Sequence, residues 1–172
     1  RLPKPKVVNK RLIVNNMEVK KLVDNARSPR DRAIILTMFQ GGLDVSTLCD
    51  LKYGDVAEGL GKELPLKLNL YRVKTGTEYY TFLARDACEA LKAYLNDVKA
   101  RGLKLSHSDP LFLKESNKAL TKEKLTPNLV QKIMREIALK AGFIDTENNG
   151  RDFNPLSPHA LRESFGSIMI NK

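Results

Sequence analysis

The sequence has no tryptophan, and it holds only two cysteines and two histidines among its 172 residues. Cys49 and Cys88 lie far apart, have no Cys-x-x-Cys partner, and fall in apolar stretches where a thiol behaves as a small hydrophobic side chain. We expect both thiols to be reduced and buried, while the spacing alone leaves a disulfide open. His107 and His159, the only histidines, cannot form a His/Cys zinc cluster with them, so we expect neither a metal nor a cofactor.

The sequence also lacks a long apolar run. No stretch has the length of a membrane span, and the N-terminal residues do not follow the pattern of a signal peptide. The chain begins at Arg1 rather than Met, which indicates a domain excised or processed from a longer protein. Its length fits one domain with a core of its own, and we expect that domain to be cytoplasmic.

Charge of one sign is in excess. Lys and Arg number 30 against 20 Asp and Glu, which gives a net charge of +10 and a pI near 9.6. Such an excess attracts polyanions and favours phosphate contacts through counterion release. Solubility or thermal stability explains a lysine-rich surface equally well, so charge alone leaves both interpretations open.

The first twelve residues, RLPKPKVVNKRL, are basic and interrupted by proline. We interpret residues 1–12 as a linker that leads into the domain, with Lys4 and Lys6 placed to lie along DNA. A tail with no role is the alternative interpretation.

Helical periodicity dominates the rest of the chain. Four helices are predicted to begin at a capping residue: Glu18 supports the first of these starts, and a proline in the first turn supports each of the other three. The predicted helices cover residues 15–26, 29–41, 45–53, 85–100 and 127–142, and run from 158 to the C-terminus.

One segment breaks this period. Residues 66–73 alternate apolar and polar side chains, Thr75 and Gly76 form a turn, and residues 78–83 are rich in strand-forming side chains. Lys74 then lies at the mouth of a β-hairpin. Residues 102–124 are of mixed character, with residues 110–113 as a short buried anchor. The predicted fold is mainly α with a small antiparallel β-hairpin.

His159 and Arg162 are spaced to lie on one face at the start of the last helix. The first turn of a helix carries unpaired N–H groups and positive potential, and an arginine can grip two phosphate oxygens at once. A histidine can bond a further oxygen or move a proton. A structural role for both side chains is the alternative, because so short a motif matches often by chance.

Four segments together resemble the tyrosine recombinase (phage integrase) family, in the family's order. LSPHALRESF, residues 156–165, resembles the family box L-S-P-H-x-L-R-H-x-F over nearly its whole length. FQGGLDVSTLCDLKYGDV, residues 39–56, resembles the family's first box, and YRVKTGTEYYTFL, residues 71–83, resembles its hairpin. RLIVNNMEVKKLVDNA, residues 11–26, resembles its first helix, so the resemblance spans essentially the whole chain.

This resemblance implies the fold of DNA breaking-rejoining enzymes over residues 13–172 and metal-independent strand cleavage through a 3′-phosphotyrosyl intermediate. It implies that Arg162 binds the non-bridging phosphate oxygens, that His159 orients the phosphate or moves a proton, and that Lys74 is the general acid toward the 5′ oxygen. Arg72 is expected to contact DNA beside Lys74. The implied partner is duplex DNA, bound by a tetramer on paired sites. The implied source is a prokaryotic cell, with a recombinase of archaeal or mobile-element type.

Two departures from the family pattern stand out. Asp44 occupies the position of the family's first catalytic arginine, and a carboxylate repels phosphate at short range. Either Arg72 or Arg32 supplies the missing charge, or the match shifts locally, or cleavage is impaired; locally, Asp44 is expected to cap the short helix that follows. In addition, all five tyrosines precede Arg162, so we expect a domain incomplete at its C-terminus that binds DNA without cutting it.

Two other functions remain as alternatives. The chain would be a non-catalytic DNA-binding relative, acting as an accessory or regulator, if Asp44 marks lost chemistry. It would be a basic helical domain without a nucleic-acid role if its positive charge serves only solubility.

Overall fold

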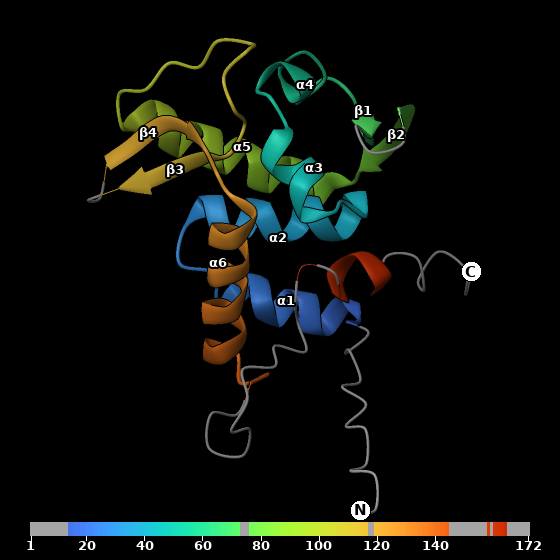
Figure 1. Ribbon diagram of the computed structural model, residues 1–172, viewed down its shortest axis with the longest axis vertical. Coiled ribbons are helices and arrows are strands. Elements are labelled where there is room, and N and C mark those ends of the chain that lie inside the picture. Colours follow the sequence, from blue (N-terminus) through green and yellow to red (C-terminus); the bar gives the residue numbers. More distant parts are fainter. Residues whose placement is uncertain (1–13, 73–75, 117–118, 145–157, 159, 165–172) are drawn as a thin grey trace, which may run out of the picture.

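The structure is a computed structural model that describes residues 14–72, 76–116, 119–144, 158 and 160–164 (Figure 1). Helices α1 to α6 and two small antiparallel sheets make up these residues, as the sequence predicts for a mainly α fold. The elements are α1 (Asn16–Asp24), α2 (Pro29–Gly41), α3 (Val45–Asp50), α4 (Gly54–Ala57), β1 (Leu66–Arg72), β2 (Thr77–Leu83), α5 (Arg85–Ala100), β3 (Leu113–Ser116), β4 (Ala119–Lys124) and α6 (Pro127–Lys140).

The predicted capping residues begin their helices. The Asn15 side chain accepts a 2.9 Å hydrogen bond from the Glu18 N–H, and the Glu18 carboxylate accepts one of 2.8 Å from the Asn15 N–H. Ser28 caps α2 and Thr126 caps α6, each followed by a proline in the first turn. Each cap gives an acceptor to an N–H that has no partner within its helix, which explains why these starts follow from local sequence.

Helix α2 lies at the centre of the core. It packs against α5 on one side and α1 on the other, and α6 stands beside them against α3 (Figure 1). Its buried side chains Ile34, Ile35 and Met38 have no exposed surface. Burial of an aliphatic side chain of this size contributes about 1.5–3 kcal/mol, so α2 carries a large part of the stability.

The first sheet is the predicted hairpin. Leu66 pairs with Leu83 and Arg72 with Thr77. Leu66, Leu68 and Leu70 are buried against the helices, while the residues between them face outward. Alternation therefore placed this hairpin correctly.

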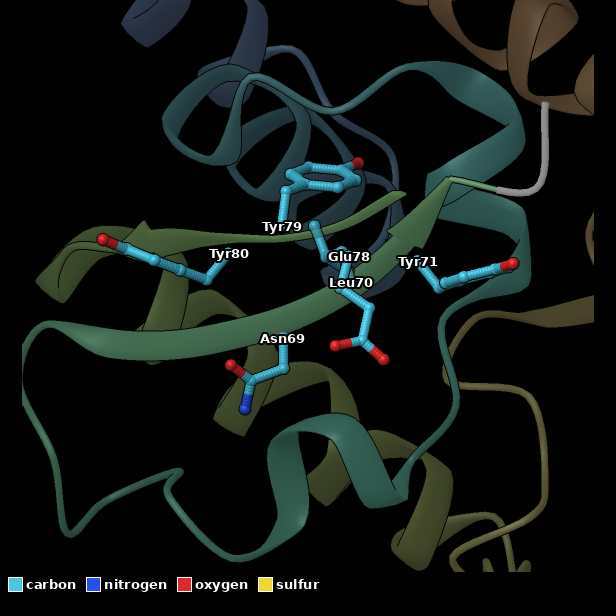
Figure 2. Close-up of a pocket in the computed structure, with 6 residues that line it drawn as sticks. All are labelled: Asn69, Leu70, Tyr71, Glu78, Tyr79 and Tyr80. Carbon is cyan, nitrogen blue, oxygen red and sulfur yellow. The ribbon is translucent and has the colours of Figure 1, made fainter. Parts of the chain in front are cut away.

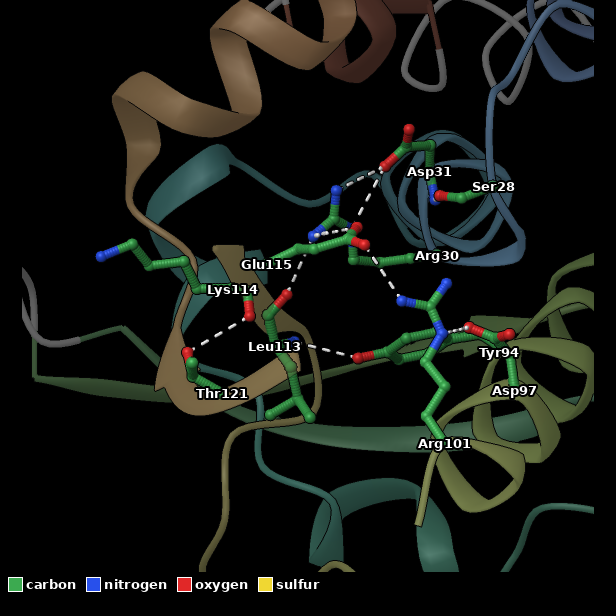
Figure 3. Close-up of polar contacts among 10 residues, drawn as sticks. All are labelled: Ser28, Arg30, Asp31, Tyr94, Asp97, Arg101, Leu113, Lys114, Glu115 and Thr121. Carbon is green, nitrogen blue, oxygen red and sulfur yellow. Dashed lines mark hydrogen bonds and ion pairs between the residues drawn. The ribbon is translucent and has the colours of Figure 1, made fainter. Parts of the chain in front are cut away.

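The second sheet, β3–β4, was not predicted, and the prediction of a single hairpin was wrong. Strand β4 has no buried side chain, so its sequence lacks the alternation that marks a half-buried strand. Contacts remote in sequence hold the pair instead: Leu113 donates its N–H to the Tyr94 hydroxyl at 2.9 Å, and its carbonyl accepts a 3.1 Å bond from Arg30 (Figure 3).

Arg30 is the centre of an ion network that runs from the buried Asp31 to partly exposed side chains. Its side chain is 11% exposed and lies 3.1 Å from the Asp31 carboxylate, which is 7% exposed. Glu115 extends the network to Arg101 at 3.0 Å, and Arg101 in turn pairs with Asp97 on its own helix (Figure 3). The network joins α2, α5 and β3, three elements that sequence periodicity treats separately.

The helix predicted over residues 45–53 ends earlier, at Asp50 of α3, and α4 begins as a separate helix at Gly54. Leu51 leaves the helical conformation, with ψ of 135°. Its carbonyl accepts a 2.8 Å hydrogen bond from the Leu111 N–H, and the Tyr53 N–H donates one of 2.9 Å to the Asp109 carbonyl. The chain at 109–111 therefore takes over backbone bonds that a continuous helix would have used internally.

Candidate functional site

Arg162 lies on a short helical segment whose other described residues are mostly buried. Pro158 and residues 160–164 are helical, and Ala160, Leu161 and Ser164 are buried. The Ser164 hydroxyl donates a 2.7 Å hydrogen bond to the Ala160 carbonyl and accepts one of 2.7 Å from the Val14 N–H. The segment, drawn in red in Figure 1, is thus fastened to the start of α1, while the Arg162 side chain stays 35% exposed.

Asp44 is the partner that the fold brings to Arg162. An Arg162 terminal nitrogen, Nη1, lies 3.3 Å from Asp44 Oδ2, across 118 positions of the sequence. The other carboxylate oxygen, Oδ1, accepts a 2.8 Å hydrogen bond from the Thr47 N–H and caps α3. The expected capping role of Asp44 is confirmed, and its pairing with Arg162 is a feature that sequence reasoning missed.

Not all of the predicted site residues can be placed. His159, Lys74, Lys4 and Lys6 lie outside the described residues. Arg72 is the last residue of β1, where its backbone pairs with Thr77.

Arg32, one of the two cations considered as a replacement for the family's first arginine, is exposed on α2. The cation that the structure brings to Asp44 is Arg162 itself. Of the residues predicted for the site, Arg162 and Asp44 are the two that lie together in the part of the chain that the structure describes.

Ser164 and Val14 were also missed, although a partial signal exists. Ser164 follows Ala160 by one helical turn, on the face that a small buried residue marks. Which residue meets the Ser164 hydroxyl depends on how the chain returns to α1, and local sequence carries no such information.

The tyrosines occupy structural positions. Tyr94 is fully buried in α5, where its ring stacks on Phe112 at 5.7 Å between centroids. Burial raises the pKa of its hydroxyl to about 12. Tyr71 and Tyr80 are exposed on the hairpin, Tyr79 is half-buried there, and Tyr53 precedes α4 beside His107.

A shallow hollow lies on the β1–β2 hairpin (Figure 2). Its lining residues are Asn69, Leu70, Tyr71, Glu78, Tyr79 and Tyr80. The lining residues include neither Asp44 nor Arg162, so this hollow does not coincide with the ion pair.

Both thiols are buried and unpaired, as predicted. Burial, with a smaller contribution from the Asp50 charge, raises the pKa of Cys49 to about 11. Burial likewise raises the pKa of Cys88. Protonated, buried thiols are poor nucleophiles and poor metal ligands, so neither cysteine fits a catalytic role.

Within the described ranges, no group of three or more His, Cys, Asp or Glu side chains is arranged to hold a metal ion. The helices in that same part of the chain include none that combines the length and apolar character needed to cross a membrane.

Comparison with known proteins agrees with the motif order. The sequence profile described as the phage integrase family matches residues 13–172. The tyrosine recombinase XerA of Pyrococcus furiosus is 31% identical over 170 residues, which are 98% of this chain and 50% of that protein. The tyrosine recombinase XerC of Halalkalibacterium halodurans is also 31% identical, over 90% of this chain and 47% of its own length.

Solved structures share the fold. A crystal structure of XerA recombinase superposes with a TM-score of 0.68 at 23% identity, over 99% of this chain and 53% of that one. Lambda integrase (residues 75–356) bound to DNA gives a TM-score of 0.62 at 18% identity, over 99% of this chain and 54% of that one. The chain spans about half the length of the curated relatives it matches. From the profile match and the shared fold, the chain belongs to the phage integrase family.

Proposed function

We propose that this chain supplies the phosphate-binding part of a site that cuts and rejoins DNA strands in site-specific recombination. One observation carries the proposal. Arg162 stands in a segment that matches the family's L-S-P-H-x-L-R pattern, and its guanidinium stays partly exposed while Ala160, Leu161 and Ser164 of the same segment are buried. The buried neighbours fix the backbone, and the exposed guanidinium is left to meet a ligand.

The proposed chemistry follows from the charge that develops at a phosphate under attack. Arg162 binds the non-bridging oxygens, where its planar N–H donors match their geometry. His159 orients the phosphate or moves a proton, and Lys74 protonates the departing 5′ oxygen. The reaction proceeds without a metal, so these cations carry the neutralisation that a metal would otherwise supply.

The proposed partner is duplex DNA, and the proposed assembly is a tetramer on paired sites. Among structures of similar fold, XerH is described as bound to its difH substrate, and lambda integrase as a tetramer bound to a Holliday junction. The net charge of +10 supports a polyanionic partner for this chain. We propose that the protein acts in the cytoplasm of a prokaryotic cell and that a mobile element encodes it.

We propose further that residues 1–12 are a basic linker, with Lys4 and Lys6 along DNA and Arg72 contacting DNA from the hairpin. Residues 13–172 belong to the strand-cleaving domain. All five tyrosines precede Arg162, and none of them is proposed as the nucleophile.

Binding of mixed-sequence duplex DNA at several salt concentrations tests the proposal. We expect affinity to fall steeply with salt, and Arg162→Gln to weaken binding and reduce the salt slope by about 1. Arg27→Gln is the matched control, because Arg27 is a partly exposed arginine in a 2.7 Å ion pair with Glu136, a residue outside the proposed site. Affinity that is independent of salt, or equal for both variants, contradicts the proposal.

A second function is favoured by one specific observation, the pairing of Asp44 with Arg162. In a non-catalytic DNA-binding relative, the carboxylate would hold this arginine away from chemistry. The full-length protein distinguishes the two functions on a suicide substrate that traps a 3′-phosphotyrosyl adduct. An adduct formed with Asp44 in place supports the enzyme; an adduct that forms only after Asp44→Arg supports the accessory role.

A further inference from the structure

We propose that Asp44 is a competitor for the Arg162 guanidinium, so that a DNA phosphate must displace its carboxylate to be bound. The inference rests on the proposed function, because it takes Arg162 as a phosphate ligand. It adds a residue that sets the affinity of the site and is not itself a phosphate ligand.

The geometry makes Asp44 a fixed competitor. Its Oδ1 is held by the Thr47 N–H at 2.8 Å, while Oδ2 faces Arg162 Nη1 at 3.3 Å. A carboxylate fixed at a helix cap cannot follow the guanidinium when that group turns toward a ligand. A phosphate oxygen that approaches Nη1 therefore meets the same donor that Oδ2 occupies, and it also meets a like charge at short range.

The ion pair between Asp44 and Arg162 is weak enough for a phosphate to replace the carboxylate. The two side chains are 32% and 35% exposed, and one 3.3 Å contact joins them in place of a bidentate pair. Ion pairs with this exposure are weak, and water and salt compete with them. A phosphate can receive two N–H groups from one arginine, so it forms the stronger partner once it is near.

The alternative is that Asp44 positions Arg162 for the phosphate. The backbone segment that carries Arg162 is fixed without the ion pair, by burial of Ala160 and Leu161 and by the two hydrogen bonds of Ser164. The ion pair is not needed to hold that segment. The two roles also predict opposite signs, because removing a competitor strengthens phosphate binding and removing a positioning residue weakens it.

Asp44→Asn is the informative variant. Asparagine caps a helix about as well as aspartate, so α3 keeps its start while the negative charge is lost. We expect mixed-sequence duplex DNA to bind the Asp44→Asn chain about two- to fivefold more tightly at fixed salt. Glu136→Gln is the matched control: it removes one negative charge from an ion pair of similar exposure, 33% for Glu136, on α6.

A double-mutant cycle with Arg162→Gln assigns the gain to the pair. If Asp44 acts through Arg162, Asp44→Asn gives no more than the Glu136→Gln gain once Arg162 is already Gln. The inference is overturned if the Asp44→Asn chain binds DNA as tightly as, or more weakly than, the original chain. It is also overturned if Asp44→Asn gives its full gain in DNA affinity in a chain that already carries Arg162→Gln.

Failure of the proposed function is separate. If the proposed function is wrong, Arg162→Gln leaves salt-dependent DNA binding unchanged, with or without the Asp44→Asn change. The inference that Asp44 competes with phosphate is then overturned as well. When Arg162→Gln weakens binding and Asp44→Asn does not strengthen it, the proposed function stands and only the competitor role is overturned.

Discussion

The backbone N–H of Val14 donates a 2.7 Å hydrogen bond to the Ser164 hydroxyl, joining residues 150 positions apart. The same hydroxyl donates to the Ala160 carbonyl, so both of its hydrogen-bonding roles are used. Through Ser164 the point where the chain enters α1 is tied to the segment that carries Arg162. The placement of the segment that carries Arg162 therefore depends on a hydrogen bond from a residue 150 positions earlier in the chain.

Ser164→Ala is expected to destabilise the fold. It leaves the buried Val14 N–H without its acceptor, which costs about 1–3 kcal/mol. Urea unfolding measures this as a lower free energy of unfolding at an unchanged slope. Ser108→Ala, at an exposed serine, is the control; a Ser164→Ala chain as stable as this control would show that the bond contributes nothing.

Asp44→Ala is expected to destabilise the fold by about 1 kcal/mol, whereas Asp44→Asn is nearly neutral, because only alanine removes the cap on the Thr47 N–H. The same unfolding measurement compares the two. Equal losses in both variants would mean that the charge of Asp44 stabilises the fold and its cap does not, and would weaken Asp44→Asn as a test of DNA binding.

Tyr94 is expected to lose its proton only at strongly alkaline pH. Burial raises its pKa from the ordinary 10.0 to about 12 in the folded chain, so the unfolded chain releases this proton first. Its contribution to stability is therefore complete below about pH 10 and is lost as the pH rises toward 12. Ultraviolet absorbance of tyrosinate follows the titration, and Tyr94→Phe should remove the late step; a titration curve that keeps this step refutes the assignment.

Cys49 is expected to resist thiol reagents while the chain is folded. The pKa of its thiol lies near 11 because of burial, so almost no thiolate exists at neutral pH. Modification should be slow in the native chain and fast in urea, with Cys88→Ser used to isolate Cys49. Rapid labelling of that variant under native conditions would contradict both its burial and its raised pKa.

Local sequence accounts for most of the helices. The capping box of Asn15 and Glu18 and the Ser28 and Thr126 caps each depend on residues within one helical turn. The β1–β2 hairpin follows from a period of two over Leu66, Leu68 and Leu70. Such patterns can be predicted from the sequence because the interacting groups are neighbours in the chain.

The candidate site could be predicted in part from the sequence. Local sequence is enough to recognise Arg162 within its motif and the helix cap at Asp44. The ion pair between them cannot, because no rule of spacing links two residues 118 positions apart. The β3–β4 sheet was missed for a related reason: Arg30 and Tyr94 hold Leu113 from other helices, while β4 itself buries no side chain.

The sequence by itself determined the family, the helix starts, the first hairpin and the motif that contains Arg162. These follow from side-chain chemistry and from contacts within a few residues. Tertiary structure alone decided that Asp44 faces Arg162 and that Ser164 binds Val14. Both contacts exist because packing of α1, α2 and α3 brings distant segments together, and the free energy of that packing is a property of the whole core.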